Sequence, residues 1–254
     1  MKGENFVDHL DGLMKQEWER QNPLFQKIRE TGVREYFENL PNLDKAFQLR
    51  DHSLRCIDEG TPGGIHMAGS GILSETGALE LAKQAKIDGV YSHEGCGAAA
   101  LYAKQAGLDV SKSDEIGIEW SKKLAELAGV SYKGHLVFSQ MSRPGDYHTA
   151  RVVYFDGSGN FDPTAIDGVP NGFVISRRFL ESFYALQELQ VAINIAFGHH
   201  GLGNNFTSED PLWVVTVGDN ALSEVNLESL TKEIDGIVRT HNGRVASFGF
   251  NTPR

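Results

Sequence analysis

The chain has 254 residues, of which 40% are hydrophobic and 23% charged, and its formal net charge is −10. Such a chain is long enough for a large buried core, and we predict a single α/β domain over residues 1–254. The net negative charge, with basic residues scattered, argues against nucleic acid or an anionic membrane surface as partner. The charged N-terminus lacks the apolar segment of a signal peptide, and no apolar run reaches the roughly 20 residues of a bilayer span, so we expect a cytoplasmic protein.

Residues 4–31 predict two amphipathic helices that break near Pro23, where Asn22 is a suitable cap. These helices make up most of an N-terminal helical arm predicted over residues 1–35. One face of the arm carries more apolar side chains than a surface helix leaves exposed: Phe6, Leu10, Leu13, Met14 and Trp18. We expect this face to dock on the protein's own core or on a second subunit.

After the arm, strand-like and helix-like segments alternate with short connections. The predicted strands are residues 52–58, 64–73, 88–93, 134–141, 149–155, 212–217 and 244–250. The predicted helices are residues 74–86, 97–107, 111–129 and 176–198, with a mostly helical segment between the last two strands. This alternation predicts an α/β fold with a mixed, largely parallel central sheet flanked by helices. No internal repeat, low-complexity segment or linker is recognisable.

The chain has two cysteines, Cys56 and Cys96. In a cytoplasmic protein such thiols are inert core residues, metal ligands or nucleophiles. Cys56 and Asp58 lie at the end of one predicted strand, and His93 and Cys96 lie at the end of another. Parallel strands deliver their carboxyl ends to one crevice, so these side chains can converge there. Two thiolates and one imidazole suit Zn²⁺, which prefers tetrahedral sulfur and nitrogen ligands.

The same residues carry a resemblance to a known family. "CID" (56–58) followed by "HEGCG" (93–97) is similar to the Cys-x-Asp-x-Arg and His-x-x-Cys-Gly signature of the β-class carbonic anhydrases. "HMAGSGI" (66–72) is similar to the Arg-Asn-Ala-Gly-Asn segment of that family. The resemblance covers roughly residues 50–105, which form the predicted metal-site core.

The resemblance implies a β-carbonic-anhydrase-like fold with one Zn²⁺ per chain, bound by Cys56, His93 and Cys96. The fourth metal position would hold water or Asp58. Such an enzyme hydrates CO2, or a similarly small electrophile, to bicarbonate through zinc-bound hydroxide, with Asp58 orienting the hydroxide. The resemblance also implies a homodimer or a higher even homo-oligomer, in which the N-terminal arm crosses onto a neighbour and the subunits share the active-site walls.

The chain departs from the family at Gly60, where the family has an arginine that pairs with the aspartate and keeps it off the metal. Here Asp58 is either the fourth ligand or held by another donor. Arg55 points to the opposite face of its strand, which leaves Arg143 and Arg151 as candidates. If Asp58 binds the metal, the protein is a non-catalytic zinc protein with a closed site and a structural or regulatory role. In that case Gly60→Arg should open the site.

A third reading is a zinc hydrolase of another small molecule, in which Glu94 or the neighbouring His199 and His200 supply acid-base chemistry. Each of these residues also has a simpler interpretation. Glu94 suits a solvent-facing position at a helix N-terminus, and the two histidines suit a solvated loop at a helix end.

The candidate metal ligands have simpler interpretations too. Cys56 and Cys96 are small enough to be ordinary core residues, and His93 is a suitable helix cap. Asp58 is well placed to accept hydrogen bonds from the backbone of the turn that follows it. The spatial arrangement of the four side chains distinguishes these interpretations.

Overall fold

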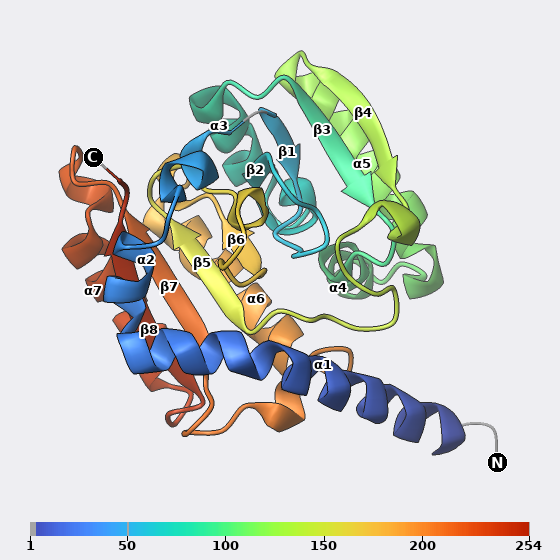
Figure 1. Ribbon diagram of the computed structural model, residues 1–254. Helices are drawn as coiled ribbons and strands as arrows, with labels where there is room; N and C mark the ends of the chain where they lie inside the picture. The colour runs from blue at the N-terminus through green and yellow to red at the C-terminus, as the bar shows by residue number, and fades with distance from the viewer. Residues whose placement is uncertain (1–3, 50, 254) are drawn as a thin grey trace.

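The structure is a computed structural model that describes residues 4–49 and 51–253 (Figure 1). Its strands are β1 (Ser53–Arg55), β2 (Ile65–His66), β3 (Gly89–His93), β4 (Ser131–Leu136), β5 (Val152–Asp156), β6 (Phe173–Ile175), β7 (Leu212–Gly218) and β8 (Val245–Asn251). Its α-helices are α1 (Glu4–Thr31), α2 (Val33–Glu38), α3 (Glu75–Ala85), α4 (Gly97–Gln105), α5 (Ser113–Ala128), α6 (Ser182–Phe197) and α7 (Leu227–Arg239). The first three residues of the predicted arm and the first residue of the predicted metal-site core lie outside the described residues.

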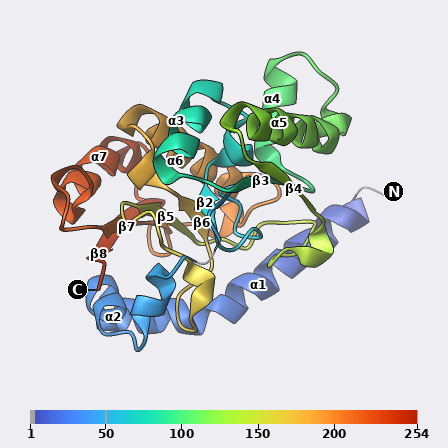
Figure 2. The same cartoon turned by 90° about the horizontal axis from the view of Figure 1, so that it is seen from above.

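The strands form two four-stranded sheets, ordered β2-β1-β3-β4 and β6-β5-β7-β8. Each pair of neighbouring strands within the described residues runs parallel. Figure 2 shows helices α3 to α7 on one side of the strands and α1 and α2 on the other. The predicted α/β fold with largely parallel strands and flanking helices is therefore confirmed, with the strands divided between two sheets.

The two sheets lie edge to edge, with β2 beside β6. The backbone N–H of Ser176 donates to the carbonyl of His66 at 3.1 Å, and the N–H of His66 donates to Ser176 Oγ at 2.9 Å. One cluster of buried apolar side chains continues from Leu54 of β1 to Val153 of β5. A common hydrophobic core therefore supports both sheets.

Local sequence explains several element boundaries. All residues of β7 are buried, as expected for a parallel strand covered on both faces, and its sequence is accordingly an almost continuous apolar run. Ser74 caps α3 as predicted, because its Oγ accepts a hydrogen bond from the N–H of Gly77 at 3.2 Å. Gly129 ends α5 in the left-handed conformation at φ 68°.

Residues 64–73, predicted to be extended, are a strand only in β2. A 3-10 helix over Ala68–Gly71 follows, and within it Gly69 and Ser70 both have φ 54°. The hydroxyl of Ser70 donates to the carbonyl of Tyr91 at 2.6 Å, which ties this turn to β3. The tight turn brings the backbone of Gly69 beside the end of β1, where the candidate ligands lie.

Two elements, α2 and β6, were not predicted, because both are short. β6 has three residues and is recognisable only from its pairing with β5. β4 begins at Ser131, before the predicted start at 134, and ends at Leu136. Residues 137–151, which include the rest of that predicted strand, form a connecting segment between the two sheets.

α1 is one continuous helix of 28 residues, and the prediction of two helices broken at Pro23 is wrong. Proline inside a helix removes one backbone hydrogen bond, but tertiary packing outweighs that local cost here. Phe25 and Ile28, which follow the proline, are fully buried. Asn22 does not cap a helix; its Oδ1 accepts a hydrogen bond from Arg151 Nη1 at 2.8 Å.

The apolar face of α1 packs on its own chain. Trp18 meets Phe206 edge to face at 5.3 Å between ring centroids, and Phe25 meets Trp213 at 4.7 Å. The side chains of α1 that are buried in the protein's own hydrophobic clusters are Leu10, Met14, Trp18, Phe25 and Ile28. Of the two docking surfaces expected for the arm, its own core is the one observed, and the homodimer stays a prediction. Within the described residues, no helix combines the length and apolar character needed to cross a bilayer.

A chain that begins at residue 32 is expected to aggregate, because it exposes the aromatic surface of Phe206 and Trp213 that α1 covers. Light scattering and size-exclusion chromatography at micromolar concentration measure this. Glu19→Ala, an exposed position on α1, is the matched control and should behave as the unmodified protein. A monodisperse truncated chain that still unfolds cooperatively would show that α1 is dispensable.

Candidate metal centre

Cys56, His93 and Cys96 come together as the sequence predicts. Cys56 follows β1, His93 ends β3 and Cys96 immediately precedes α4. The parallel pairing of β1 with β3 brings these strand ends side by side. One ligand atom from each residue lies within 4.8 Å of the others, and the two Sγ atoms are 4.0 Å apart. All three side chains are buried, so they form a Cys2His cluster that can hold a metal ion.

His93 presents an unpartnered ring nitrogen to this cluster. Its Nδ1 lies 2.9 Å from the carbonyl oxygen of Glu94, which only accepts hydrogen bonds, so Nδ1 carries the proton. Nε2 is therefore the ring nitrogen that can offer a lone pair to a metal, and within the described residues it is buried without a hydrogen-bond partner. A buried polar atom in this state is costly unless it binds something. The Nδ1–H···carbonyl bond also orients metal-binding histidines in general, and the residues present therefore fit a metal ion.

The backbone of Gly69 faces the thiol of Cys56. The N–H of Gly69 donates to Cys56 Sγ at 3.1 Å, a contact that favours the thiolate needed for metal binding. A Cβ at position 69 would lie 2.7 Å from Ile72 Cγ2 and 3.4 Å from Cys96 Sγ, and φ is positive there. Glycine is therefore required for this close approach. In the metal-free cluster burial raises the pKa of Cys56, and the hydrogen bond with Cys56 lowers the pKa of Cys96.

Asp58 is paired with Arg143 in a buried bidentate contact. Arg143 Nε donates to Oδ1 at 2.7 Å and Nη2 donates to Oδ2 at 2.8 Å. Gly60 N–H also donates to Oδ1 at 2.7 Å, the turn contact considered from the sequence. Burial alone raises the pKa of Asp58, but the charges of His148 and Arg143 and the hydrogen bonds from Arg143 hold it well below its ordinary value. Asp58 is thus an ionised carboxylate with both oxygens engaged by the guanidinium.

The other two arginines considered from the sequence lie elsewhere. Arg55 points away from the cluster as predicted; its side chain bonds to Asp51 and to the carbonyl of Pro62, the latter at 2.9 Å. The guanidinium of Arg151 lies 3.5 Å from the ring centroid of Trp18 on α1. Of the three arginines, Arg143 of the connecting segment is the one that pairs with Asp58.

Gly60 leaves the room that Arg143 occupies. A Cβ at position 60 would lie 2.6 Å from Met141 Cε, 2.8 Å from Arg143 Cγ and 3.0 Å from Asp58 Oδ1. The guanidinium expected at position 60 is therefore supplied by Arg143, and the space for a side chain at 60 is filled. This corrects the expectation that Gly60→Arg would open a closed site.

Gly60→Arg is now expected to lower stability, because it forces Met141 and Arg143 to move. Overpacking of this kind costs about 1–3 kcal/mol. Chemical denaturation of the purified variant measures the loss. Gly12→Ala, on α1 with nothing within 4 Å of the added Cβ, is the control and should not destabilise. A Gly60→Arg protein as stable as the unmodified chain would contradict the close packing at this position.

Glu59 and His148 are two site residues that sequence patterns do not single out. Both side chains are buried, and His148 Nδ1 lies 3.0 Å from Glu59 Oε2 and 3.9 Å from Asp58 Oδ2. The N–H of Thr149 donates to Glu59 Oε1 at 2.6 Å. These contacts anchor the connecting segment over the end of β1. An acid next to Asp58 is visible in the sequence, but no signal there places His148 beside it.

Glu94, His199 and His200, the residues considered for a hydrolase, make other contacts or face solvent. Glu94 Oε2 accepts a hydrogen bond from the N–H of Phe138 at 2.8 Å, so this carboxylate is half-buried and anchors the connecting segment. His199 and His200 are exposed after α6, the solvated loop considered from the sequence. His200 touches the connecting segment, since its Nδ1 lies 3.0 Å from the carbonyl of Asp146.

Comparison of the chain with protein-family models, with curated proteins and with solved structures gives no match.

Proposed function

We propose that the protein is a zinc-dependent lyase of the carbonic anhydrase type, which hydrates CO2 or a similarly small electrophile in the cytoplasm. Cys56, His93 and Cys96 would hold one Zn²⁺ per chain, because they provide two thiolates and one imidazole at a single buried point. The observation that carries the catalytic reading is the bidentate Asp58–Arg143 pair. Arg143 engages both oxygens of Asp58, and this carboxylate would otherwise compete for the fourth metal position.

The charge of the ligand set supports an active rather than a closed site. Zn²⁺ with two thiolates and a neutral imidazole is formally neutral, whereas a bound carboxylate would make the centre anionic and a weaker Lewis acid. When bound in such a site with an open position, zinc lowers the pKa of a coordinated water to about 7 and so supplies a nucleophile.

Asp58 would serve as the acceptor that orients this nucleophile. Its depressed pKa keeps it ionised, and an ionised carboxylate accepts hydrogen bonds without donating them. Oδ1 accepts hydrogen bonds from Gly60 N–H and Arg143 Nε. Among the described residues, Oδ2 accepts one hydrogen bond, from Arg143 Nη2. Oδ2 therefore retains a lone pair for a further hydrogen bond. Arg143 fixes the carboxylate and so fixes the direction of that lone pair.

Metal analysis together with a stopped-flow CO2 hydration assay tests the proposal. We expect about one zinc per chain and hydration activity that is lost in His93→Ala. His199→Ala, an exposed histidine, is the matched control and should keep both. Purified protein that binds zinc but hydrates no CO2 would refute the enzyme and leave the metal site standing.

A second candidate is a zinc protein in which the metal has a structural role. The observation that favours it is burial: Cys56, His93 and Cys96 are only 5%, 3% and 4% exposed. A structural site has four protein ligands, whereas a catalytic site keeps one position for water. X-ray absorption with an added anionic inhibitor such as azide separates the two. An inhibitor atom entering the zinc shell supports the lyase, and an unchanged shell supports the structural role.

A further inference from the structure

The two sheets have the same topology. In each, the first strand lies between the second and the third, and the fourth pairs with the third, which gives the orders β2-β1-β3-β4 and β6-β5-β7-β8. In each, a 3-10 helix follows the second strand, an α-helix joins the second strand to the third, and helical structure joins the third to the fourth. Residues 53–136, the first unit, and residues 152–251, the second unit, are therefore structural repeats that the sequence does not reveal.

The second unit has no counterpart of the Cys2His cluster, since both cysteines of the chain lie in the first unit. At the end of β5, Asp156 instead accepts hydrogen bonds within its own turn from Ser158 and Phe161. The next part of that turn is closely packed, because a Cβ at Gly159 would lie 2.6 Å from the ring of Phe179. The chain therefore contains one Cys2His cluster, which lies in the first unit.

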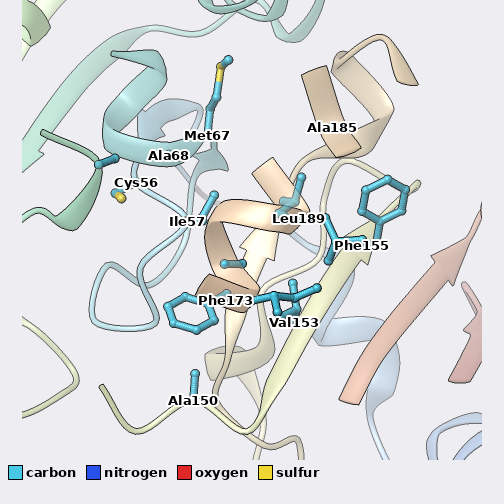
Figure 3. Close-up of a cluster of buried hydrophobic side chains, with 14 of the residues drawn as sticks. Cys56, Ile57, Met67, Ala68, Ala150, Val153, Phe155, Phe173, Ala185 and Leu189 are labelled. Atoms are coloured by element: carbon cyan, nitrogen blue, oxygen red, sulfur yellow. The ribbon is translucent and has the colours of Figure 1, made fainter. Parts of the chain in front are cut away.

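The second unit instead contacts the backbone that carries the metal cluster. Val174 N–H donates to the carbonyl of Ile57, between Cys56 and Asp58, at 3.1 Å. Asn171 Nδ2 donates to the carbonyl of Glu59 at 2.9 Å. Figure 3 shows Cys56, Ile57 and Ala68 of the first unit beside Phe173 and Leu189 of the second, with the side chains of both in one buried cluster.

One of these contacts leads directly to a metal ligand. Glu188, on α6 and only 3% exposed, accepts a hydrogen bond from the backbone N–H of Ala68. The next residue, Gly69, donates its own N–H to Cys56 Sγ. Glu188 therefore fixes the peptide that precedes the thiol's hydrogen-bond donor.

We propose that the second unit acts as a built-in partner for the first, and that Glu188 is a positioning residue for the metal site. The ligand-free repeat contacts the backbone of the site from within the same chain. This inference rests on the metal site of the proposed function. It adds that a residue outside the ligand set influences how tightly the metal is held.

The test measures zinc affinity by competition with a chromophoric chelator, and the visible spectrum of the Co²⁺-substituted protein. Glu188→Ala should raise the zinc dissociation constant about 10- to 100-fold, the effect of removing an outer partner of a metal ligand, and should shift the Co²⁺ bands. Glu188→Gln keeps an oxygen that can accept from Ala68 N–H, so it should restore most of the affinity. Glu233→Ala, which removes the partner of Arg177 within the second unit, is the matched control and should leave both readouts unchanged.

The outcomes separate this inference from the proposed function. An unmodified protein that binds no zinc refutes the metal site itself. Zinc binding that is the same in Glu188→Ala as in the unmodified protein, with unchanged Co²⁺ bands, refutes the positioning role alone. Equal loss of affinity in Glu188→Ala and Glu233→Ala would show a general effect of destabilising the second unit and would also overturn it.

Discussion

Cys96→Ala is expected to lose stoichiometric zinc. The substitution removes one of three ligands from a buried cluster with little change in volume, and leaves Cys56 and His93 as an incomplete pair. Affinity should fall by more than ~10²-fold, because even an outer partner of a ligand contributes that much. Stability should fall with it, because a metal bound only by the folded state contributes its binding free energy to folding. Metal analysis after dialysis, and thermal unfolding with and without a chelator, measure the two effects.

Ser92→Ala is the matched control for this experiment. Ser92 precedes His93 but points to the other side of β3, where its Oγ lies 2.8 Å from Tyr132 Oη and 2.9 Å from His135 Nδ1. The control should keep its zinc, although loss of these hydrogen bonds lowers stability slightly. A Cys96→Ala protein with full zinc content and unchanged melting would refute the cluster as a metal site.

Arg143→Ala is expected to be the most damaging change outside the ligands. It leaves the carboxylate of Asp58, 4% exposed, without its cation, and breaking a buried ion pair in this way costs about 3–5 kcal/mol. CO2 hydration should also fall sharply, because the freed carboxylate no longer orients the nucleophile and competes for the metal. Denaturant unfolding and stopped-flow assays at neutral pH measure both losses. Arg55→Ala, on the opposite face of β1, should leave hydration unaffected.

The pH dependence of this loss has a definite sign. A carboxyl group whose folded pKa is depressed stabilises the protein above its unfolded pKa of about 3.9, and loses that contribution as the pH falls through the lower folded value. The difference between the unmodified protein and Arg143→Ala should therefore be largest near neutral pH and shrink in acid, where Asp58 becomes protonated. The double variant Asp58→Asn/Arg143→Ala should recover much of the stability without recovering activity. A pH-independent difference would show that lost packing, rather than charge, is responsible.

The Cys2His cluster could be predicted because it depends on regular elements. Cys56 and His93 end adjacent strands of a parallel sheet, so strand periodicity and connection length were enough to bring them together. The sequence left Arg143 and Arg151 as candidate partners of Asp58 but could not decide between them, because Arg143 comes from a connecting segment with no regular pattern. Periodicity places residues within elements, whereas the path of an irregular segment depends on contacts such as that between Thr149 and Glu59.

The α/β class of the fold could be predicted, but the division of its strands between two sheets could not. Apolar runs such as β7 identify buried parallel strands, but they do not determine which strands share a sheet. The repeat of topology was invisible because topology does not require the same side chains: Cys56 follows β1, whereas β5 ends in Asp156. The break predicted at Pro23 failed for a related reason, since packing of Phe25 against Trp213 outweighs a local helix preference.

The packing of α1 also has a consequence for how the protein is made. α1 is synthesised long before its contacts Phe206 and Trp213, which lie about 180 residues later in the chain. At 5–20 residues per second, the apolar face of the newly made helix waits roughly 10–40 s for the surface that will cover it. During that interval the nascent chain carries an exposed amphipathic helix, and contacts between segments so distant in sequence form slowly. Holding chaperones bind unfolded chains, so the yield of native protein should depend on them more steeply than on the stability of the finished fold.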